Sequence, residues 1–154
     1  MNKISITAAA LCLLAGPVFA ESHAMAAPTG DATAGEAVFR QCQTCHVVQN
    51  ADGEVLAGRN AKTGPNLYGI AGRAAGSVED FRYKDSIVAA GEGGLVWDET
   101  TFVAYVQDPQ GFLRTTLDDS KARSGMSFRL RSEDDAVNLW AYLYSLAPPE
   151  AATN

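Results

Sequence analysis

Apolar positions repeat at helical spacing most clearly in the second half of the chain. Phe102, Tyr105 and Val106 stand at i, i+3 and i+4, which is the spacing of one buried helix face. Asp98 precedes them and is a good N-cap, because its carboxylate can accept a bond from a free backbone N–H of the first turn. The pattern therefore predicts a helix over residues 98–107, with Trp97 just before it.

The same period returns near the end of the chain, after three acidic residues in a first turn, where the helix dipole favours them. A last helix is predicted from Ser132, with Pro148-Pro149 blocking its continuation. Its apolar stripe consists of Ala136, Leu139, Trp140 and Leu143.

Weaker patterns predict three shorter helices, over residues 32–41, 83–90 and 110–117. Asp31 and Thr33 compete as the start of the first, and Phe39 faces inward. Gly91 is expected to stop the second helix, and Asp108-Pro109 to end the helix that precedes the third. Residues 51–62 indicate an exposed loop or short hairpin. The expected fold class is all-α, and such short helices need added apolar mass to form a core.

Composition and charge limit the possible functions. The chain has 154 residues, 47% of them apolar and 19% charged, as in a globular domain. Lys3, an apolar run over residues 4–15 and the small-residue site Val18-Phe19-Ala20 predict a signal peptide over 1–20. An uncleaved anchor and a lipoprotein through Cys12 are the alternatives. Without Lys3 the mature part holds 11 basic and 18 acidic residues, net −7, which disfavours nucleic-acid binding.

The expected organisation is a signal peptide (1–20), a flexible lead (21–30), one domain (31–147) and a tail (148–154). Signal removal would leave no membrane-spanning segment, and we expect a periplasmic monomer.

The chemistry centres on Cys42-Gln43-Thr44-Cys45-His46, a C-x-x-C-H sequence typical of c-type haem attachment. Two thiols at this spacing can form thioethers with the two vinyl groups of one porphyrin, and His46 can bind the iron. A redox dithiol or half of a zinc site are the alternatives. A zinc site needs four ligands, and after residue 20 the chain offers only these two Cys, His46 and His23.

A second ligand is expected on the other face of the iron. His23 and Met25 lie in the expected lead and are poor candidates. Met126, 80 residues after His46 in a Gly-containing loop, is the better one. Its thioether is a soft donor that raises the reduction potential. Met126 could instead fill a gap in the core.

Taken together and in order, these motifs resemble the class I c-type cytochromes, and most of all the bacterial cytochrome c2 and c550-type electron carriers. The resemblance covers residues 30–147. The matching stretches are Cys42-Gln43-Thr44-Cys45-His46, Thr63-Gly64-Pro65-Asn66-Leu67-Tyr68-Gly69, Gly72-Arg73, Phe81-Arg82-Tyr83, Trp97, Tyr105, Asp108-Pro109, Gly125-Met126 and Leu139-Trp140-Ala141-Tyr142-Leu143. It implies short helices wrapped around one covalently bound haem, with the first and last helices crossing near Gly35 and Tyr142.

The resemblance also implies roles for single residues. Met126 becomes the distal ligand opposite His46. The carbonyl of Pro65 accepts the second ring N–H of His46, and the hydroxyl of Tyr105 points at the Met126 sulfur. Donors to a haem propionate are expected from Tyr83, Trp97 and Arg73, because a half-buried carboxylate needs such partners.

Some positions depart from the pattern of the family. Ile87 stands where a polar Asn is common near a propionate, and residues 118–123 resemble an insertion before Met126. The mature charge is negative, unlike that of the basic mitochondrial carrier. Five basic residues still gather over 110–131 against only Asp118 and Asp119, which predicts a locally positive face around the haem edge; they are Arg114, Lys121, Arg123, Arg129 and Arg131.

The family's function is to pass single electrons between larger complexes. The expected partners are the cytochrome bc1 complex as donor, and a photosynthetic reaction centre or terminal oxidase as acceptor. An oxidase, a peroxidase, the haem subunit of a dehydrogenase and a sensor of diatomic gases are the alternatives. Peroxidase and sensor chemistry both need an open iron position, and His46, the only His of the expected domain, would already be used as a ligand.

Overall fold

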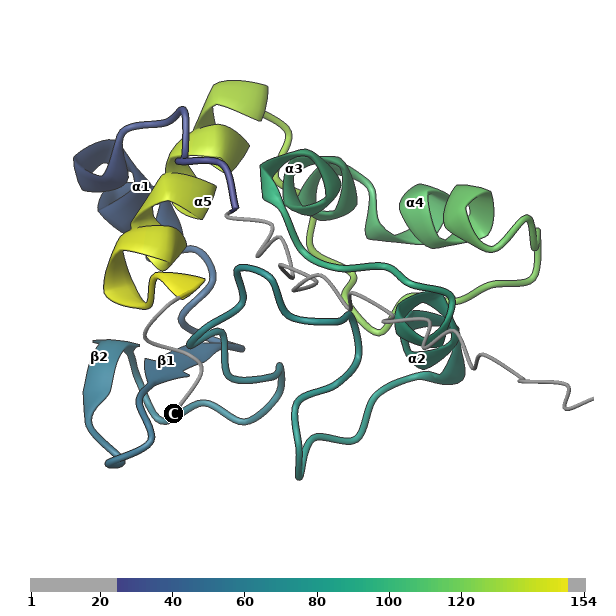
Figure 1. Ribbon diagram of the computed structural model, residues 1–154, viewed down its shortest axis with the longest axis horizontal. Helices are drawn as coiled ribbons and strands as arrows, with labels where there is room; N and C mark the ends of the chain where they lie inside the picture. Colours follow the sequence, from purple (N-terminus) through teal and green to yellow (C-terminus); the bar gives the residue numbers. More distant parts are fainter. Residues whose placement is uncertain (1–24, 150–154) are drawn as a thin grey trace, which may run out of the picture.

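Residues 25–149 are described in the computed structural model, and they form five helices and one two-stranded hairpin (Figure 1). The predicted signal peptide, with Cys12, and His23 lie outside these residues. The elements are α1 (Ala32–Phe39), β1 (Val47–Gln49), β2 (Val55–Gly58), α2 (Asp85–Glu92), α3 (Glu99–Gln107), α4 (Pro109–Thr116) and α5 (Glu133–Leu146).

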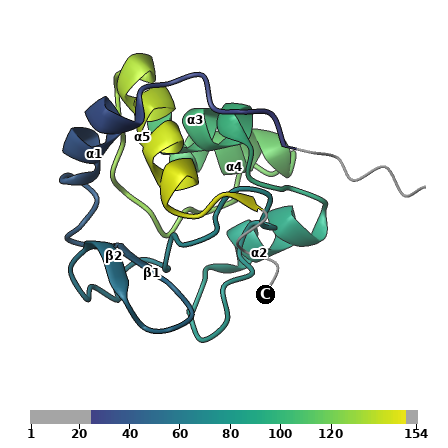
Figure 2. The same ribbon diagram turned by 60° about the vertical axis from the view of Figure 1, so that its left-hand side comes forward.

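Helices α1 and α5 cross at one end of the molecule, and α2, α3 and α4 gather at the other (Figures 1 and 2). The crossing is close because Gly35 has no side chain. A Cβ placed there would lie 2.0 Å from the carbonyl oxygen of Asn138 and 2.8 Å from the Cβ of Tyr142. Phe39 and Tyr142 also pack together, with ring centroids 5.7 Å apart. The predicted crossing near Gly35 and Tyr142 is confirmed.

Local capping explains where the other helices begin. The Asp98 carboxylate accepts from the backbone N–H of Thr101, and the Thr101 hydroxyl accepts from the backbone N–H of Asp98, which completes a capping box at α3. The Ser132 hydroxyl caps α5 through the N–H of Asp135. Asp108 ends α3 and caps α4, where Pro109 occupies the first turn and needs no hydrogen-bond acceptor. These three helices begin where the sequence predicts, within one residue.

The prediction for α2 was wrong at its end. The helix continues through Gly91 and stops at Glu92, with Gly93 as its C-cap. Gly91 is required for packing: a Cβ there would lie 2.0 Å from the carbonyl oxygen of Ala75. A glycine that permits close approach and a glycine that stops a helix look the same in the sequence.

The first helix is also shorter than predicted. Cys42 donates its N–H to the carbonyl of Phe39, three residues back, so the chain tightens into turns after α1 ends. Asp31, rather than Thr33, is the N-cap, because its carboxylate accepts from the N–H of Thr33 and Ala34. Residues 47–58 form the antiparallel hairpin β1–β2, so the all-α fold carries one small sheet.

The described part of the expected lead runs along the surface of α3 and α5. Thr29 donates its backbone N–H and its hydroxyl to the Glu99 carboxylate, at 2.8 and 2.5 Å. Gly30 packs directly on α5, since a Cβ there would lie 2.5 Å from the carbonyl oxygen of Val137. Within residues 25–149, no helix combines the length and apolar character that a membrane span requires.

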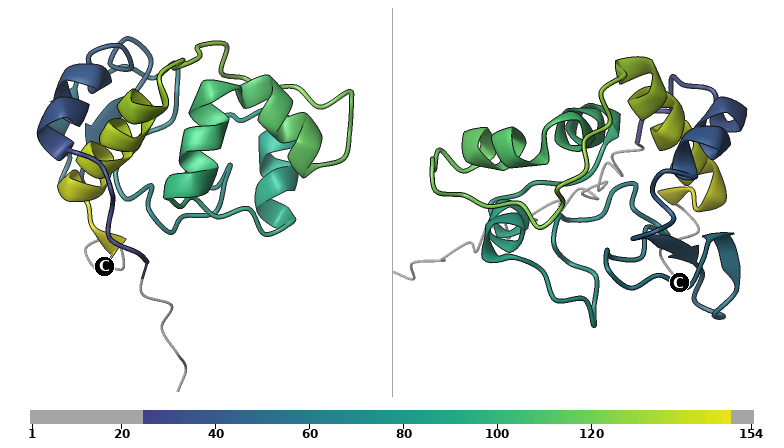
Figure 3. Two further views of the ribbon diagram at one scale, coloured as in Figure 1. Left: turned by 90° about the horizontal axis from the view of Figure 1, so that it is seen from above. Right: turned by 180° about the vertical axis from the view of Figure 1, so that it is seen from behind.

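Figure 3 shows the crossing helices and the group of three as two parts of the molecule, and buried side chains of both parts form one core. Trp140 of α5 is fully buried and packs on Phe102 of α3, with centroids 5.2 Å apart. Trp97 continues the aromatic contacts toward Tyr105 and Phe112, at 5.0 and 6.4 Å. Burying one such side chain contributes on the order of 2 kcal/mol. This core leaves a cavity between the two groups of helices.

Candidate functional site

The cavity has a volume of about 440 Å³, within the range of small-molecule and cofactor sites. All nine residues proposed from the sequence for the site line it: Cys42, Cys45, His46, Pro65, Arg73, Tyr83, Trp97, Tyr105 and Met126. They come from segments up to 84 residues apart in the sequence, and the fold brings these side chains to one cavity.

Apolar side chains make up much of the remaining wall. They come from the loop after β2, from α2, from α3 and from α5, and are Leu67, Ile70, Ile87, Phe102, Val106 and Leu139. The motifs gave no functional signal for Phe102, Val106 and Leu139, which the sequence showed only as helix faces. Ile87 is 6% exposed and can offer no hydrogen bond where the family often has Asn.

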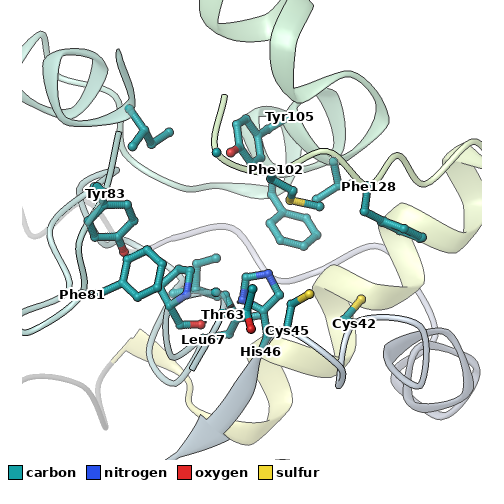
Figure 4. A pocket seen from close by; sticks show the side chains of 18 of the residues that line it. Cys42, Cys45, His46, Thr63, Leu67, Phe81, Tyr83, Phe102, Tyr105 and Phe128 are labelled. Atoms are coloured by element: carbon teal, nitrogen blue, oxygen red, sulfur yellow. Dashed lines mark hydrogen bonds between the residues drawn. The ribbon is translucent and has the colours of Figure 1, made fainter. Parts of the chain in front are cut away.

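Figure 4 shows Cys42, Cys45 and His46 along one side of the cavity, with Phe102 and Tyr105 opposite. The thiols are close to His46 because the chain turns tightly there: the Cys42 carbonyl accepts from the N–H of Cys45 at 3.0 Å and of His46 at 2.9 Å. Both cysteines are free and half-buried. Burial, and then the neighbouring Cys45, raise the pKa of the Cys42 thiol to about 11.

His46 is held as a neutral ligand would be. Its Nδ1 lies 2.9 Å from the carbonyl oxygen of Pro65, so the predicted hydrogen bond is present. With the Nδ1–H donated to this carbonyl, the lone pair of Nε2 remains free to bind a metal. Burial lowers the pKa of His46, and the Pro65 hydrogen bond offsets only part of this. The ring is therefore neutral at pH 7, the form that binds a metal.

Gly64 explains how the loop approaches His46 so closely. A Cβ on Gly64 would lie 2.4 Å from the Cε1 of His46 and 2.8 Å from its Nε2. The Gly64 N–H also donates to the Cys45 carbonyl at 2.7 Å. The loop thus supports the ring from its edge, and any other residue would push it away. The sequence marked this position only as part of the matching stretch Thr63-Gly64-Pro65-Asn66-Leu67-Tyr68-Gly69.

Asn66 and Arg73 keep the same loop in place. The Asn66 side chain bonds to both the N–H and the carbonyl of Gln49, at 3.0 and 2.7 Å, which holds the loop against the last residue of strand β1. The Arg73 guanidinium donates to the carbonyls of Tyr68 and Asn66, at 2.7 and 3.1 Å. Burial lowers the pKa of Arg73, partly opposed by Tyr83. Arg73 therefore braces the loop, a task that the sequence did not assign to it.

Tyr105 has a partner that the sequence did not suggest. Its hydroxyl lies 3.3 Å from the Ser124 Oγ, and the expected approach to the Met126 sulfur stays a prediction. Burial raises the pKa of Tyr105, and the bond to Ser124 offsets part of the rise. Ser124 also bonds to the backbone N–H and carbonyl of Met126, both at 3.0 Å. Tyr105 thus reaches Met126 through one intervening hydroxyl.

Three observations test whether these residues fit a haem. The cavity is largely apolar and of suitable size, the two thiols and the His46 imidazole share one wall, and Met126, a soft sulfur donor, lines the same cavity. Met25 lies elsewhere, against Gly72. Among residues 25–149, no three His, Cys, Asp or Glu side chains are grouped so as to hold a metal ion, so the zinc alternative gains no further ligands there. The residues fit a haem c.

Comparison with known proteins gives the family. No protein-family model matches the chain. It is 61% identical over 122 residues to a cytochrome c2 of Rhodovulum adriaticum, covering 79% of this chain and 97% of that protein. A cytochrome c-551 of Roseobacter denitrificans is 48% identical over 148 residues, covering 96% of this chain and 97% of the relative.

Solved structures agree in fold. The crystal structure of cytochrome c2 from Rhodobacter sphaeroides has a TM-score of 0.75 and 54% identity, covering 77% of this chain and 97% of that one. Ferric cytochrome c-550 from Paracoccus versutus has a TM-score of 0.73 at 40% identity, covering 77% and 99%. With this extent of identity over nearly the full length of such relatives, the chain belongs to the class I c-type cytochromes, among the bacterial cytochromes c2 and their c-550-type relatives.

Proposed function

We propose that this electron carrier works in the periplasm with one haem c, attached through Cys42 and Cys45 and bound at the iron by His46 and Met126. When bound, the haem supplies an iron that gains or loses one electron. The observation that carries the proposal is the single cavity in which two thiols, a neutral imidazole and a thioether meet. With both faces of the iron taken by the chain, no substrate needs to reach the metal, which argues against catalysis.

The protein's own groups would set the properties of the site. His46 keeps its orientation through Pro65, and a histidine that donates its second N–H is a more basic ligand. The Met126 thioether favours the reduced iron and raises the potential. Arg73, Tyr83 and Trp97 all line the cavity, and we propose them as the donors that face a propionate.

Intact-mass measurement of the exported protein tests this function and the proposed domain organisation together. We expect mature protein to begin at Glu21, because the apolar run of residues 4–15 and Val18-Phe19-Ala20 form a cleavable signal. The mass should equal residues 21–154 plus one haem. Protein that keeps residues 1–20, or that lacks the haem after export, would contradict the proposal.

The partners proposed are the cytochrome bc1 complex as donor, and a reaction centre or terminal oxidase as acceptor. Docking would use the edge of the cavity, where the exposed cations Arg82 and Lys84 form part of the lining. Arg123 lies beside them, since its backbone N–H donates to Ser86 in the first turn of α2, at 2.9 Å. Arg129 contributes less than the sequence suggested, because it forms an ion pair with Asp108 at 2.8 Å.

Lys121 and Arg123 belong to the positive face predicted over residues 110–131. Reversing both charges, Lys121→Glu with Arg123→Glu, is expected to slow electron transfer to an acidic acceptor and to flatten its salt dependence, because steering weakens when the local field changes sign. Stopped-flow kinetics at several ionic strengths measure this. Arg40→Glu with Arg59→Glu is the control, since both residues are exposed, neither lines the cavity, and the net charge changes equally. Rates and salt slopes equal to those of the control would show that residues 121–123 do not dock.

A further inference from the structure

Met126 lies midway between two buried anchors of its own segment, residues 122–130. Ala122, four residues before it, is 2% exposed, and Leu130, four residues after it, is 4% exposed. The backbone N–H of Leu130 donates to the carbonyl of Val106 at the end of α3, at 2.9 Å. The ion pair of Arg129 with Asp108 lies next to this anchor. The later half of the segment is therefore fixed to the junction of α3 and α4.

The earlier half is held by Gln110 of α4. Its amide Nε2 donates to the carbonyl of Ala122, and its Oε1 accepts from the backbone N–H of Ser124 at 3.4 Å. A neutral amide offers both a donor and an acceptor, so one side chain satisfies two backbone groups of the segment. Ser86 adds a third bond through the N–H of Arg123. Residues 118–123, which resemble an insertion, thus end in a stretch that is held by hydrogen bonds from α4 and α2.

Ser124 passes this support on to Met126. Its hydroxyl accepts from the Met126 N–H and donates to the Met126 carbonyl, both at 3.0 Å. A serine hydroxyl has one proton, which is used here on the Met126 carbonyl, so the hydroxyl of Tyr105 must donate to Ser124 across their 3.3 Å contact. Two helices therefore hold Ser124 in place, α4 through Gln110 and α3 through Tyr105, and Ser124 in turn bonds to the Met126 backbone.

We propose that Gln110 is a positioning residue for the distal ligand: together with Ser124 it keeps Met126 against the cavity, so that the state with Met126 withdrawn is rarely populated. The inference rests on the proposed function, in which Met126 binds the iron. Gln110 touches neither the cavity nor the iron; it acts through the backbone of residues 122–124. Groups that orient a metal ligand tune its binding although they do not bind the metal.

Imidazole binding to the ferric holoprotein tests the proposal. Added imidazole can bind only when Met126 has left the iron, so its apparent affinity scales with the fraction of protein in the withdrawn state. Gln110→Leu removes both bonds: the Ser124 N–H is left unpaired, and the buried Ala122 carbonyl keeps only the exposed Arg123 guanidinium, at 3.2 Å. We expect imidazole to bind roughly tenfold more tightly to Gln110→Leu, and to a similar degree to Ser124→Ala, from the usual cost of unpaired groups.

Further variants separate positioning from general stability. Gln110→Glu retains the acceptor for Ser124, loses the donor to Ala122, and suits the first turn of α4; its imidazole affinity should lie between those of Gln110→Leu and wild type. Ser124→Thr keeps the hydroxyl and should bind imidazole as wild type does. Gln107→Leu is the matched control, because Gln107 makes none of these contacts. Val38→Ala, in the α1 core, should lower the unfolding midpoint without raising the imidazole affinity.

The outcomes distinguish this inference from the proposed function. If the wild-type ferric protein lacks the weak red absorption band of sulfur–iron ligation, Met126 is not the ligand and both ideas fail. If the band is present and both Gln110→Leu and Ser124→Ala bind imidazole as wild type does, the proposed function stands and the positioning role is overturned. An equal gain in Gln107→Leu or Val38→Ala would also overturn it.

Discussion

Met126→Ala is expected to keep its haem and lose its high reduction potential. The two cysteines and His46 are unchanged in this variant, so attachment should persist. The soft thioether is gone, and water or a nearby lysine should take its place, which removes the preference for the reduced iron. The cavity contains Lys84 in its lining, so an amine is within reach of a modest loop movement.

Potentiometry and absorption spectra measure the effect. The midpoint potential should fall, the red sulfur–iron band should disappear, and the reduced variant should bind carbon monoxide, since one face of the iron has opened. Met25→Ala is the matched control: Met25 packs on Gly72 outside the cavity lining, so its potential and spectrum should not change. A Met126→Ala protein with wild-type potential and spectrum would exclude Met126 as the ligand.

Replacing both thiols, Cys42→Ser with Cys45→Ser, should abolish covalent attachment altogether. They are the free cysteines of residues 25–149, and both face the cavity. A single replacement leaves one thioether and should still retain haem after denaturation. The double variant should release all of it into acidified organic solvent, and its intact mass should be that of the polypeptide alone.

The double variant should also fold poorly. Helices α1 to α4 have only 8 or 9 residues each, and isolated helices of this length are marginal in water. A cavity of about 440 Å³ without a covalently held occupant leaves much of their apolar surface unpacked. We expect broad, weakly cooperative thermal unfolding. Cys12→Ser, within the predicted signal, is the control and should leave the mature mass unchanged; covalent haem in the double variant would contradict the attachment sites.

The parts of the fold that depend on local chemistry could be predicted from the sequence. Asp98, Asp108 and Ser132 cap helices with their own side chains, so the starts of α3, α4 and α5 follow from a few neighbouring residues. The end of α2 could not be predicted, because Gly91 is needed for contact with Ala75, sixteen residues away. Nothing near Gly91 in the sequence records that contact.

The residues of the site also differ in how readily the sequence predicts them. Cys42, Cys45 and His46 form a contiguous motif whose spacing suits one porphyrin. The remaining residues were assigned to one haem by the resemblance, and the structure shows that they line one cavity. The partners of individual polar groups were harder to predict. The sequence directed Tyr105 to the Met126 sulfur and did not suggest Ser124, which bonds to the Tyr105 hydroxyl and to the Met126 backbone.

The contacts of Gln110 could not be predicted for the same reason. A glutamine near the start of a helix usually faces water, and its two partners lie 12 and 14 residues further along the chain. Hydrogen bonds that depend on the relative placement of two segments leave no local trace in sequence. The sequence could thus identify the ligands of the site more readily than the groups that hold those ligands in position.

One haem iron, held between His46 and Met126, is proposed to carry single electrons. Spectroelectrochemical titration of the wild-type holoprotein tests this proposal most directly. We expect one reversible transition that fits a single electron, with the sulfur–iron band present in the oxidised protein and no rapid binding of carbon monoxide to the reduced protein. A missing band, or fast binding of carbon monoxide by the reduced protein, would show an open iron and contradict the account.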